Sequence, residues 1–525
     1  MRLHRKFSSH FFSPAEGKNF SLSPFTGRGG QKHWVLTEDG VSLDVEVRGA
    51  GNTEEVGRPL VILPASWAAS ASSFGWFLDW LAESGYIVAA YSPRGFRGSG
   101  GRVEAASHSD VQDLSTLIDW VEQHYPCADT ERVAAVGLSY GAGISLLAAA
   151  FEPRIATVVA VDGWADLGSA LLAGDTPRLS TALLVAGALG GHFSPDVALK
   201  SLLLYSGLGR AQLRDWAAQR SAAQHIERFD RPGLSVLLAA GWNDTVLRAE
   251  QAHAFHQQLP CRSRLLLHPD EHPVLPWAQL TSESGREIWR RAGDWLDQEL
   301  RGLPRGVPTE GVEVLGSPAK QRPLPSRTTS HPVVPARTQV YGLGPPRRLG
   351  PGRMGAEGSA WQARLRGALP SGATDRFPAL SRLVERVTGY PPSVYFPLVP
   401  GPAAASWTTA VFDRPRKLRG SPVLEGSVSC HARRVTVTAH LYAVGPSGVG
   451  RLCSQGAVTL ATGGKGPAPF SVTLRTAVCD VPTGHRLGLI VGTWDPTCRG
   501  ATRPLSRVVL HSSEEHQAAL TVPLS

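Results

Sequence analysis

The sequence predicts an α/β domain built on a parallel sheet, followed by a second domain made of β-strands. Between about residues 60 and 300, short apolar runs alternate with helical patterns, as expected for parallel strands covered on both faces. A Pro-, Gly- and Arg-rich stretch follows. After it come short alternating runs separated by Gly and Pro turns, a pattern typical of a sandwich or jelly roll. A chain of 525 residues is also too long for a single core.

The first domain begins with a hairpin, because residues 34–48 alternate around an Asp39-Gly40 turn. Apolar positions at helical spacing predict a helix over Ser109–His124 and a closing helix over Ser282–Leu300. Six further strands are predicted at Leu60–Leu63, Tyr86–Tyr91, Val133–Val136, Thr157–Val161, Leu234–Ala240 and Arg264–Leu267. These strands define the parallel sheet.

Strand patterns stop between about residues 166 and 231, where helical periodicity indicates a helical cap inserted into the sheet domain. The domain boundaries expected from these patterns are a disordered leader at 1–33, the α/β domain at 34–301, a linker at 302–358 and a jelly-roll domain at 359–525. The leader lacks the apolar core of a secretory signal. Because it is basic, Ser-rich and poor in acidic residues, an organelle transit peptide is the alternative to a disordered leader on a cytoplasmic protein.

Composition argues against several classes of partner. The net charge of +9 comes mainly from scattered arginines, and no basic–aromatic run predicts a nucleic-acid partner. No apolar run reaches the ~18–20 residues of a membrane span. The six cysteines form no CxxC pair, so we expect free thiols, with a bridge among the four in the last hundred residues as the alternative. We expect neither a cofactor nor a metal, since His268 and His272 lie in a Pro-broken loop. The oligomeric state is left open.

The strongest local motif is Gly137-Leu138-Ser139-Tyr140-Gly141, between an apolar strand and a helix of small residues. A nucleophile at a sharp strand-to-helix turn needs glycine on both sides, because a Cβ there would meet neighbouring backbone. The N–H groups at the start of the helix also favour a developing oxyanion. The motif therefore predicts the α/β-hydrolase fold with Ser139 as nucleophile. The alternative is an ordinary tight turn.

A serine nucleophile needs a histidine base and an orienting carboxylate, which follow in this fold in the order Ser, Asp, His. Asp244 comes directly after the strand over 234–240, where the acid is expected, although it could instead cap the helix near Leu247. His268 and His272 both follow the next strand. We favour His272 as the base because it lies further into the loop, and regard His268 as structural.

Two backbone donors are expected to stabilise the oxyanion. One is the N–H of Tyr140, directly after the nucleophile. The other should come from the loop Pro64-Ala65-Ser66-Trp67. Because Pro64 has no N–H, the second donor is either Ala65 or Ser66.

These motifs resemble the family of X-prolyl dipeptidyl-peptidases, cocaine esterase and α-amino-acid ester hydrolases. In the first domain the resemblance rests on the loop at 94–101, the segment 137–141, the segment 241–244 and the following histidine pair. In the second domain, residues 420–426, 439–448 and 484–487 resemble the family's jelly roll. The resemblance implies that α/β domain, cap and jelly roll together wall the substrate pocket. It also implies the roles of nucleophile, acid and base for Ser139, Asp244 and His272.

The sequence departs from the family in two respects. Cocaine esterase carries a tyrosine hydroxyl as oxyanion donor where this chain has Ala65, so Ser66 or a backbone N–H must substitute. Only about thirty residues precede the hydrolase core, where true X-prolyl peptidases carry an extended domain. We therefore expect a serine hydrolase that cleaves a small ester or amide through a covalent acyl-enzyme.

Three alternatives stay open. An X-Pro dipeptidyl aminopeptidase would need an acid to hold the substrate ammonium, and Glu83 and Asp175 are the weak candidates for it. Acyl transfer would use the same catalytic residues with a different acceptor. A catalytically degenerate scaffold would leave a β domain that binds a ligand.

Overall fold

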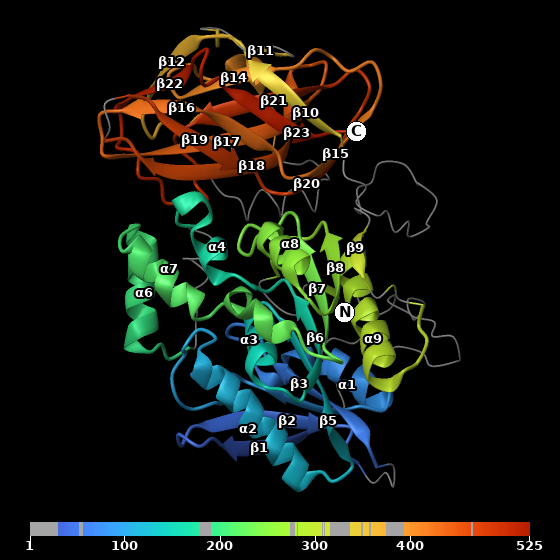
Figure 1. Ribbon diagram of the computed structural model, residues 1–525. Helices are drawn as coiled ribbons and strands as arrows, with labels where there is room; N and C mark the ends of the chain where they lie inside the picture. Colours follow the sequence, from blue (N-terminus) through green and yellow to red (C-terminus); the bar gives the residue numbers. More distant parts are fainter. Residues whose placement is uncertain are drawn as a thin grey trace, which may run out of the picture.

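The protein is described here by a computed structural model. The described residues are 30–51, 56–178, 191–273, 279–280, 282–306, 308, 310–315, 337–347, 350–355, 359–373, 393–463 and 466–525. The predicted leader lies outside them up to residue 29, and its last three residues, 31–33, belong to the first strand rather than to a leader. An α/β domain and a β-rich domain lie one above the other (Figure 1).

The α/β domain contains a sheet that has nine strands among the described residues, in the order β1-β2-β4-β3-β5-β6-β7-β8-β9. Strands β1, β2 and β4 pair antiparallel at one edge, and all later neighbours pair parallel. The strands are β1 (Gln31–Leu36), β2 (Ser42–Arg48), β3 (Arg58–Pro64), β4 (Ile87–Tyr91), β5 (Ala128–Leu138), β6 (Ile155–Val161), β7 (Ser235–Gly241), β8 (Arg262–His268) and β9 (Gly311–Val314). The predicted hairpin and parallel strands are confirmed.

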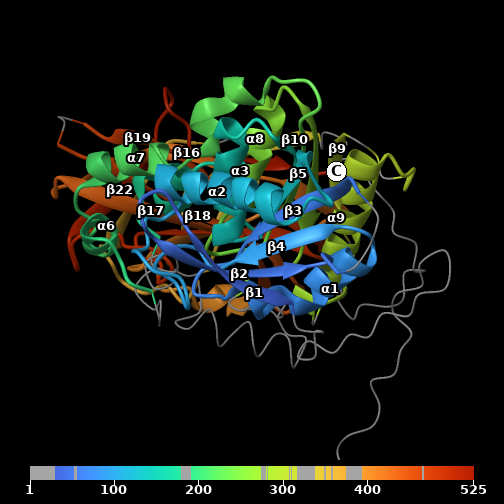
Figure 2. The same cartoon turned by 90° about the horizontal axis from the view of Figure 1, so that it is seen from below.

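Helices cover both faces of this sheet, as Figure 2 shows from below. Successive strand residues point to opposite faces: Leu60 and Ile62 pack into one core, whereas Val61 and Leu63 pack into the other. Helices α2, α3 and α8 contribute to the first core, and α1 and α9 contribute to the second. The helices are α1 (Gly75–Glu83), α2 (His108–His124), α3 (Tyr140–Phe151), α8 (Ala249–Gln258) and α9 (Glu283–Arg301), with the short η1 (Ala71–Phe74) before α1.

A helical insertion separates β6 from β7, as the sequence predicts. Its described elements are α4 (Leu167–Leu171), η2 (Ala173–Asp175), α6 (Pro195–Ser206), α7 (Arg210–Ala218) and η3 (Ala222–Phe229). Residues 179–190 of the predicted cap lie outside the described part. In Figure 1 the insertion lies to one side of the sheet, with α4 reaching up to the β-rich domain.

The predicted linker at 302–358 is wrong over part of its length. Strand β9 completes the α/β sheet beside β8, while β10 (Thr338–Leu343) and β11 (Gly352–Gly355) pair within the β-rich domain. These strands contain four to six residues each, and the surrounding Pro and Gly hid their short patterns. Residues 316–336 lie outside the described part.

Most strands of the β-rich domain belong to a sheet that has twelve strands among the described residues; β15 and β20 form a separate pair. Alternate strand residues form a separate core of this domain around Trp407, Leu441 and Leu489. The remaining elements are β12 (Trp361–Arg366), β13 (Ser393–Tyr395), η5 (Phe396–Leu398), β14 (Ala404–Thr408), β15 (Arg416–Gly420), β16 (Val423–Cys430), β17 (Arg434–Val444), β18 (Val449–Ala461), β19 (Ala468–Thr473), β20 (Ala477–Val481), β21 (Arg486–Gly492), β22 (Arg507–Ser512) and β23 (Ala519–Pro523).

Polar contacts join the two domains just after η2 and at the N-terminal end of α8. Thr176 and Thr459 share a hydroxyl hydrogen bond of 2.9 Å, and the Arg499 N–H donates to the Pro177 carbonyl at 2.8 Å. The backbone N–H of Thr476 donates to the Glu250 carboxylate. Within the described residues, no helix is long and apolar enough to cross a membrane.

Candidate active site

Ser139 lies at the turn between β5 and α3 with φ 55° and ψ −111°. A non-glycine residue at positive φ is strained, and such strain is characteristic of a nucleophile elbow. The flanking glycines are required here: a Cβ on Gly137 would lie 2.2 Å from the Gly141 carbonyl carbon, and one on Gly141 would lie 2.1 Å from the Pro64 oxygen. The Ser139 N–H is held by the Val161 carbonyl at 2.8 Å.

Three side chains form a hydrogen-bonded chain at this turn. Ser139 Oγ lies 2.9 Å from His272 Nε2, and His272 Nδ1 lies 2.8 Å from Asp244 Oδ2. All three residues are buried, with exposed fractions of 3%, 8% and 1%. This arrangement can remove a proton from the serine hydroxyl and stabilise the imidazolium that results.

Asp244 uses its two carboxylate oxygens for different purposes. Oδ2 faces His272, while Oδ1 accepts the backbone N–H groups of Val246 at 2.7 Å and Leu247 at 2.8 Å. The two interpretations of this residue, orienting acid and local cap, are therefore both satisfied geometrically. The neighbouring Asn243 amide donates to the Pro269 carbonyl at 2.6 Å, which ties the acid loop to the base loop.

Electrostatics prepare His272 to take up a proton. Burial lowers the pKa of His272, but the charge of Asp244 and its hydrogen bond outweigh that effect, so the pKa is raised above the ordinary value of 6.5. Asp162 and Glu271 add smaller contributions in the same direction.

His268 lies four residues before His272 in a different environment. Its Nε2 is 2.8 Å from Asp162 Oδ1 and its Nδ1 is 3.7 Å from Asp270 Oδ2, and the side chain is fully buried. Burial lowers the pKa of His268, but Asp162 and then Asp270 raise it to about 10. His268 is thus held between two carboxylates.

One predicted oxyanion donor needs correction. The Ala65 N–H donates to the Tyr91 carbonyl at 2.9 Å, because Ala65 continues the pairing of β3 with β4. It is not available to a substrate oxygen in this structure, and Ser66 and Tyr140 stay as the candidates. The Tyr140 hydroxyl accepts the Ala106 N–H at 3.0 Å, which anchors the side chain below the turn.

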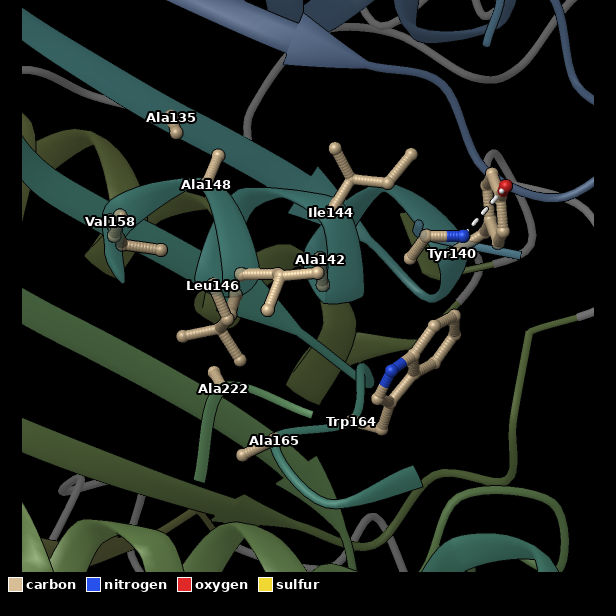
Figure 3. Packing of buried hydrophobic residues seen from close by; sticks show 14 of the residues in the cluster. Ala135, Tyr140, Ala142, Ile144, Leu146, Ala148, Val158, Trp164, Ala165 and Ala222 are labelled. Carbon is tan, nitrogen blue, oxygen red and sulfur yellow. Dashed lines mark hydrogen bonds between the residues drawn. The ribbon is translucent and has the colours of Figure 1, made fainter. Parts of the chain in front are cut away.

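A pocket opens beside Ser139, and its walls are largely apolar. The sequence did not single out these walls, because most come from the cap, where periodicity shows which face is apolar but not what it contacts. Figure 3 shows two wall residues, Tyr140 and Trp164, beside one another at one end of α3. The pocket is lined by Trp67, Ala105, Ser139, Tyr140, Trp164, Leu167, Leu171, Val197, Lys200, Ser201, Leu204, Leu213, Trp216, Val246 and Leu247.

Neither acid considered for an ammonium site lines this pocket. Glu83 is exposed at the end of α1, and Asp175 forms ion pairs with Arg214 at 2.7 Å and with Arg434 of the β-rich domain. Across the described residues, no group of three or more His, Cys, Asp or Glu side chains could hold a metal ion.

Comparisons with known proteins show similarity to one family of hydrolases over part of the chain. Residues 39–194, which include the nucleophile turn, match the model of the X-Pro dipeptidyl-peptidase (S15) family. The match covers less than half of the chain, so it shows a resemblance to this family in the segment that carries Ser139. Dipeptidyl-peptidase 5 of Porphyromonas gingivalis is 25% identical over 286 residues, which amount to 52% of this chain and 38% of that protein. The chain thus spans well under half the length of this curated relative.

Solved structures show the same fold over nearly the whole chain. An aminopeptidase from a marine sediment Thaumarchaeota archaeon matches with a TM-score of 0.68 and 14% identity, covering 97% of this chain and 99% of that one. A CocE/NonD family hydrolase from Staphylococcus aureus matches with 0.68 and 13%, covering 94% and 93%. An α-amino acid ester hydrolase matches with 0.67 and 14%, covering 99% and 100%. The predicted α/β-hydrolase fold with a C-terminal β-rich region is confirmed.

Proposed function

We propose that the chain is an acyl hydrolase that cleaves a small, largely apolar ester or amide through a covalent acyl-enzyme. The observation that carries this proposal is the continuous hydrogen-bonded chain from Ser139 through His272 to Asp244. Ser139, the first member of this chain, lines an apolar pocket. A small-molecule ester or amide is accordingly the partner we propose, and a cytoplasmic location stays a prediction.

In the proposed mechanism, Ser139 Oγ attacks the carbonyl carbon while His272 Nε2 accepts the hydroxyl proton. Asp244 Oδ2 stabilises the imidazolium and fixes its orientation. The oxyanion is bound by the Tyr140 N–H, with Ser66 as the proposed second donor. His272 then returns the proton to the leaving alcohol or amine, and water, activated by the same histidine, releases the acid from Ser139.

Pocket size and polarity support a small apolar substrate. The cavity measures ≈ 60 Å³, well below the roughly 150 Å³ of an engineered cavity that takes up benzene. Indole and aliphatic side chains form most of its walls, so transfer of an apolar group from water is favourable there. A charged acyl group would lose its hydration there, and the one cationic side chain among the wall residues of the described chain, Lys200, is already paired with Asp196 at 2.7 Å.

An X-Pro dipeptidyl aminopeptidase is the second candidate, because residues 39–194 match that family's model. Asp196 contacts one of the pocket walls, because it accepts the Trp216 indole N–H at 2.6 Å. Its charge is balanced by Lys200 at 2.7 Å and Arg220 at 3.8 Å. An ammonium group would have to compete with both cations, so we rank this activity second.

Steady-state hydrolysis separates the two candidates. We expect kcat/KM for 4-nitrophenyl acetate or butyrate to exceed that for a neutral long-chain ester, and to exceed that for Gly-Pro-4-nitroanilide. Efficient cleavage of the dipeptide anilide with weak ester turnover would reverse the ranking. Ser139→Ala serves as the matched blank in both assays, since it keeps the pocket but lacks the nucleophile.

A further inference from the structure

Three arginines from different parts of the chain meet where the cap, α8 and the β-rich domain come together. Arg178 follows η2, Arg248 immediately precedes α8, and Arg475 lies between β19 and β20. Their exposed fractions are 5%, 8% and 7%. Buried arginine normally has a carboxylate partner or a full set of acceptors, because an unpaired buried charge is costly.

Arg178 has no carboxylate partner among the described residues, and Arg248 has an incomplete set of acceptors. Neither Nε nor Nη2 of Arg178 has a hydrogen-bond acceptor among the described residues, and the same is true of Nε and Nη2 of Arg248. The one carboxylate within ion-pair distance of these two side chains in the described part of the chain is Glu250, whose Oε2 lies 3.1 Å from Arg248 Nε. Glu250 also accepts the Thr476 N–H, so its charge is shared.

The arginines are held in place by their backbones and neighbours. The Arg178 N–H donates to Leu171 O at 3.1 Å, and Arg178 forms an isolated β-bridge with Cys498 of the β-rich domain. Arg475 Nη1 faces the carbonyl oxygens of Asn243 and Asp244 at 3.3 and 3.5 Å. Arg178 and Arg475 are therefore both anchored at the contact between the two domains.

We propose that this cluster is a binding site for a small oxyanion, either phosphate or a carboxylate group, between the two domains. Guanidinium groups offer paired N–H donors whose geometry matches both kinds of anion. The site lies outside the pocket walls, so the proposal does not depend on the hydrolase activity. Through Arg475 a bound anion would also order the loop that carries Asp244.

The electrostatics agree with this geometry. Burial lowers the pKa of Arg248 to about 9, Glu250 partly offsets that effect, and Arg178 and Arg475 lower it further. The nearby Asp495 carboxylate is already bound to His440 at 2.8 Å and to the Thr497 N–H at 2.7 Å, so it does not neutralise them.

Isothermal titration of the full chain with sodium phosphate and, separately, with sodium acetate tests the proposal, using sodium chloride at equal ionic strength as reference. Wild-type protein should bind at least one of the two anions. Binding of phosphate alone assigns a phosphate site, and binding of acetate alone assigns a carboxylate site.

Arg248→Gln should weaken binding by roughly ten- to a hundred-fold, since it removes charge-assisted hydrogen bonds. Arg507→Gln, which changes an exposed arginine on β22, should bind as wild type.

Thermal unfolding provides a second readout that does not require large heats of binding. Phosphate or acetate should raise the Tm of wild-type protein but not that of Arg178→Gln or Arg248→Gln. Without added anion, Arg178→Gln should be at least as stable as wild type, because it removes a buried charge that has no carboxylate partner among the described residues. Absence of binding by both anions in folded wild-type protein, or equal binding by Arg248→Gln, would overturn the proposal.

Discussion

His268 and His272 lie four residues apart after the same strand, yet their surroundings assign them opposite chemistry. His268 is fully buried between Asp162 and Asp270 and contacts no nucleophile among the described residues. His272 has one bound carboxylate, and its second nitrogen faces Ser139 at 2.9 Å. The difference teaches that the number of carboxylates, together with access to the serine, distinguishes His268 from His272, the histidine that we propose as the general base.

The difference in surroundings also determines the protonation state expected for His268. The two carboxylates raise the pKa of His268 to about 10 despite burial, so at neutral pH its imidazolium holds no free lone pair to accept a proton. Asp162 is itself held by the Gln279 amide at 2.6 Å and the Gly241 N–H at 3.1 Å. His268 therefore fixes the ends of β6, β7 and β8, from which the acid and base loops leave the sheet.

The largest effect is expected from removing the base. His272→Ala should lower kcat for ester hydrolysis by roughly 10⁴- to 10⁶-fold, as expected when a serine loses its proton acceptor. His268→Ala should retain far more activity, assayed at a temperature where circular dichroism shows both variants folded. A greater loss in His268→Ala would exchange the two roles.

Asp244→Asn should follow, with a loss in kcat of about 10⁴-fold, because the amide no longer fixes the required imidazole tautomer. The pH profile gives a second test. Wild-type kcat/KM should rise through a pKa above 6.5 as His272 loses its proton, and the residual activity of Asp244→Asn should rise at lower pH, where burial dominates. An unchanged profile would place the acid elsewhere.

His268→Gln should act mainly on stability and its pH dependence. The pKa of His268 is higher in the folded protein than in the unfolded chain. Its charge therefore contributes fully to the free energy of unfolding below about pH 6.5. It is lost as the pH rises towards about 10. Urea unfolding at pH 6, 8 and 10 should show that the wild-type advantage over the variant shrinks with pH. A constant difference would mean that His268 is uncharged in the folded protein.

The smallest effect is expected from Asp162→Asn. The charge of Asp162 also contributes to raising the pKa of His272, although less than that of Asp244. The acidic limb of the kcat/KM profile should therefore move to lower pH by less than in Asp244→Asn, with kcat at the optimum reduced only modestly. A shift larger than that of Asp244→Asn would show that the two histidines titrate as one unit.

The parts of the fold and of the candidate site that could be predicted from the sequence are those set by local backbone geometry. The strand preceding Ser139 and the glycines around it have local steric causes, and the order Ser, Asp, His follows from the fold. The failure at Ala65 has a nonlocal cause, because its N–H is taken up by Tyr91 across the sheet. Strands such as β9 were hidden by their shortness, and the pocket walls depend on how the cap packs, which periodicity does not specify.

Labelling of the purified protein with a fluorophosphonate, followed by mass-spectrometric mapping of the adduct, tests the proposed catalytic chain most directly. The account predicts one adduct at Ser139 that is absent from Ser139→Ala, strongly slowed in His272→Ala and retained in His268→Ala. Failure of the folded wild-type protein to react, or an adduct on another serine, would contradict the proposed nucleophile and favour a scaffold without hydrolase activity.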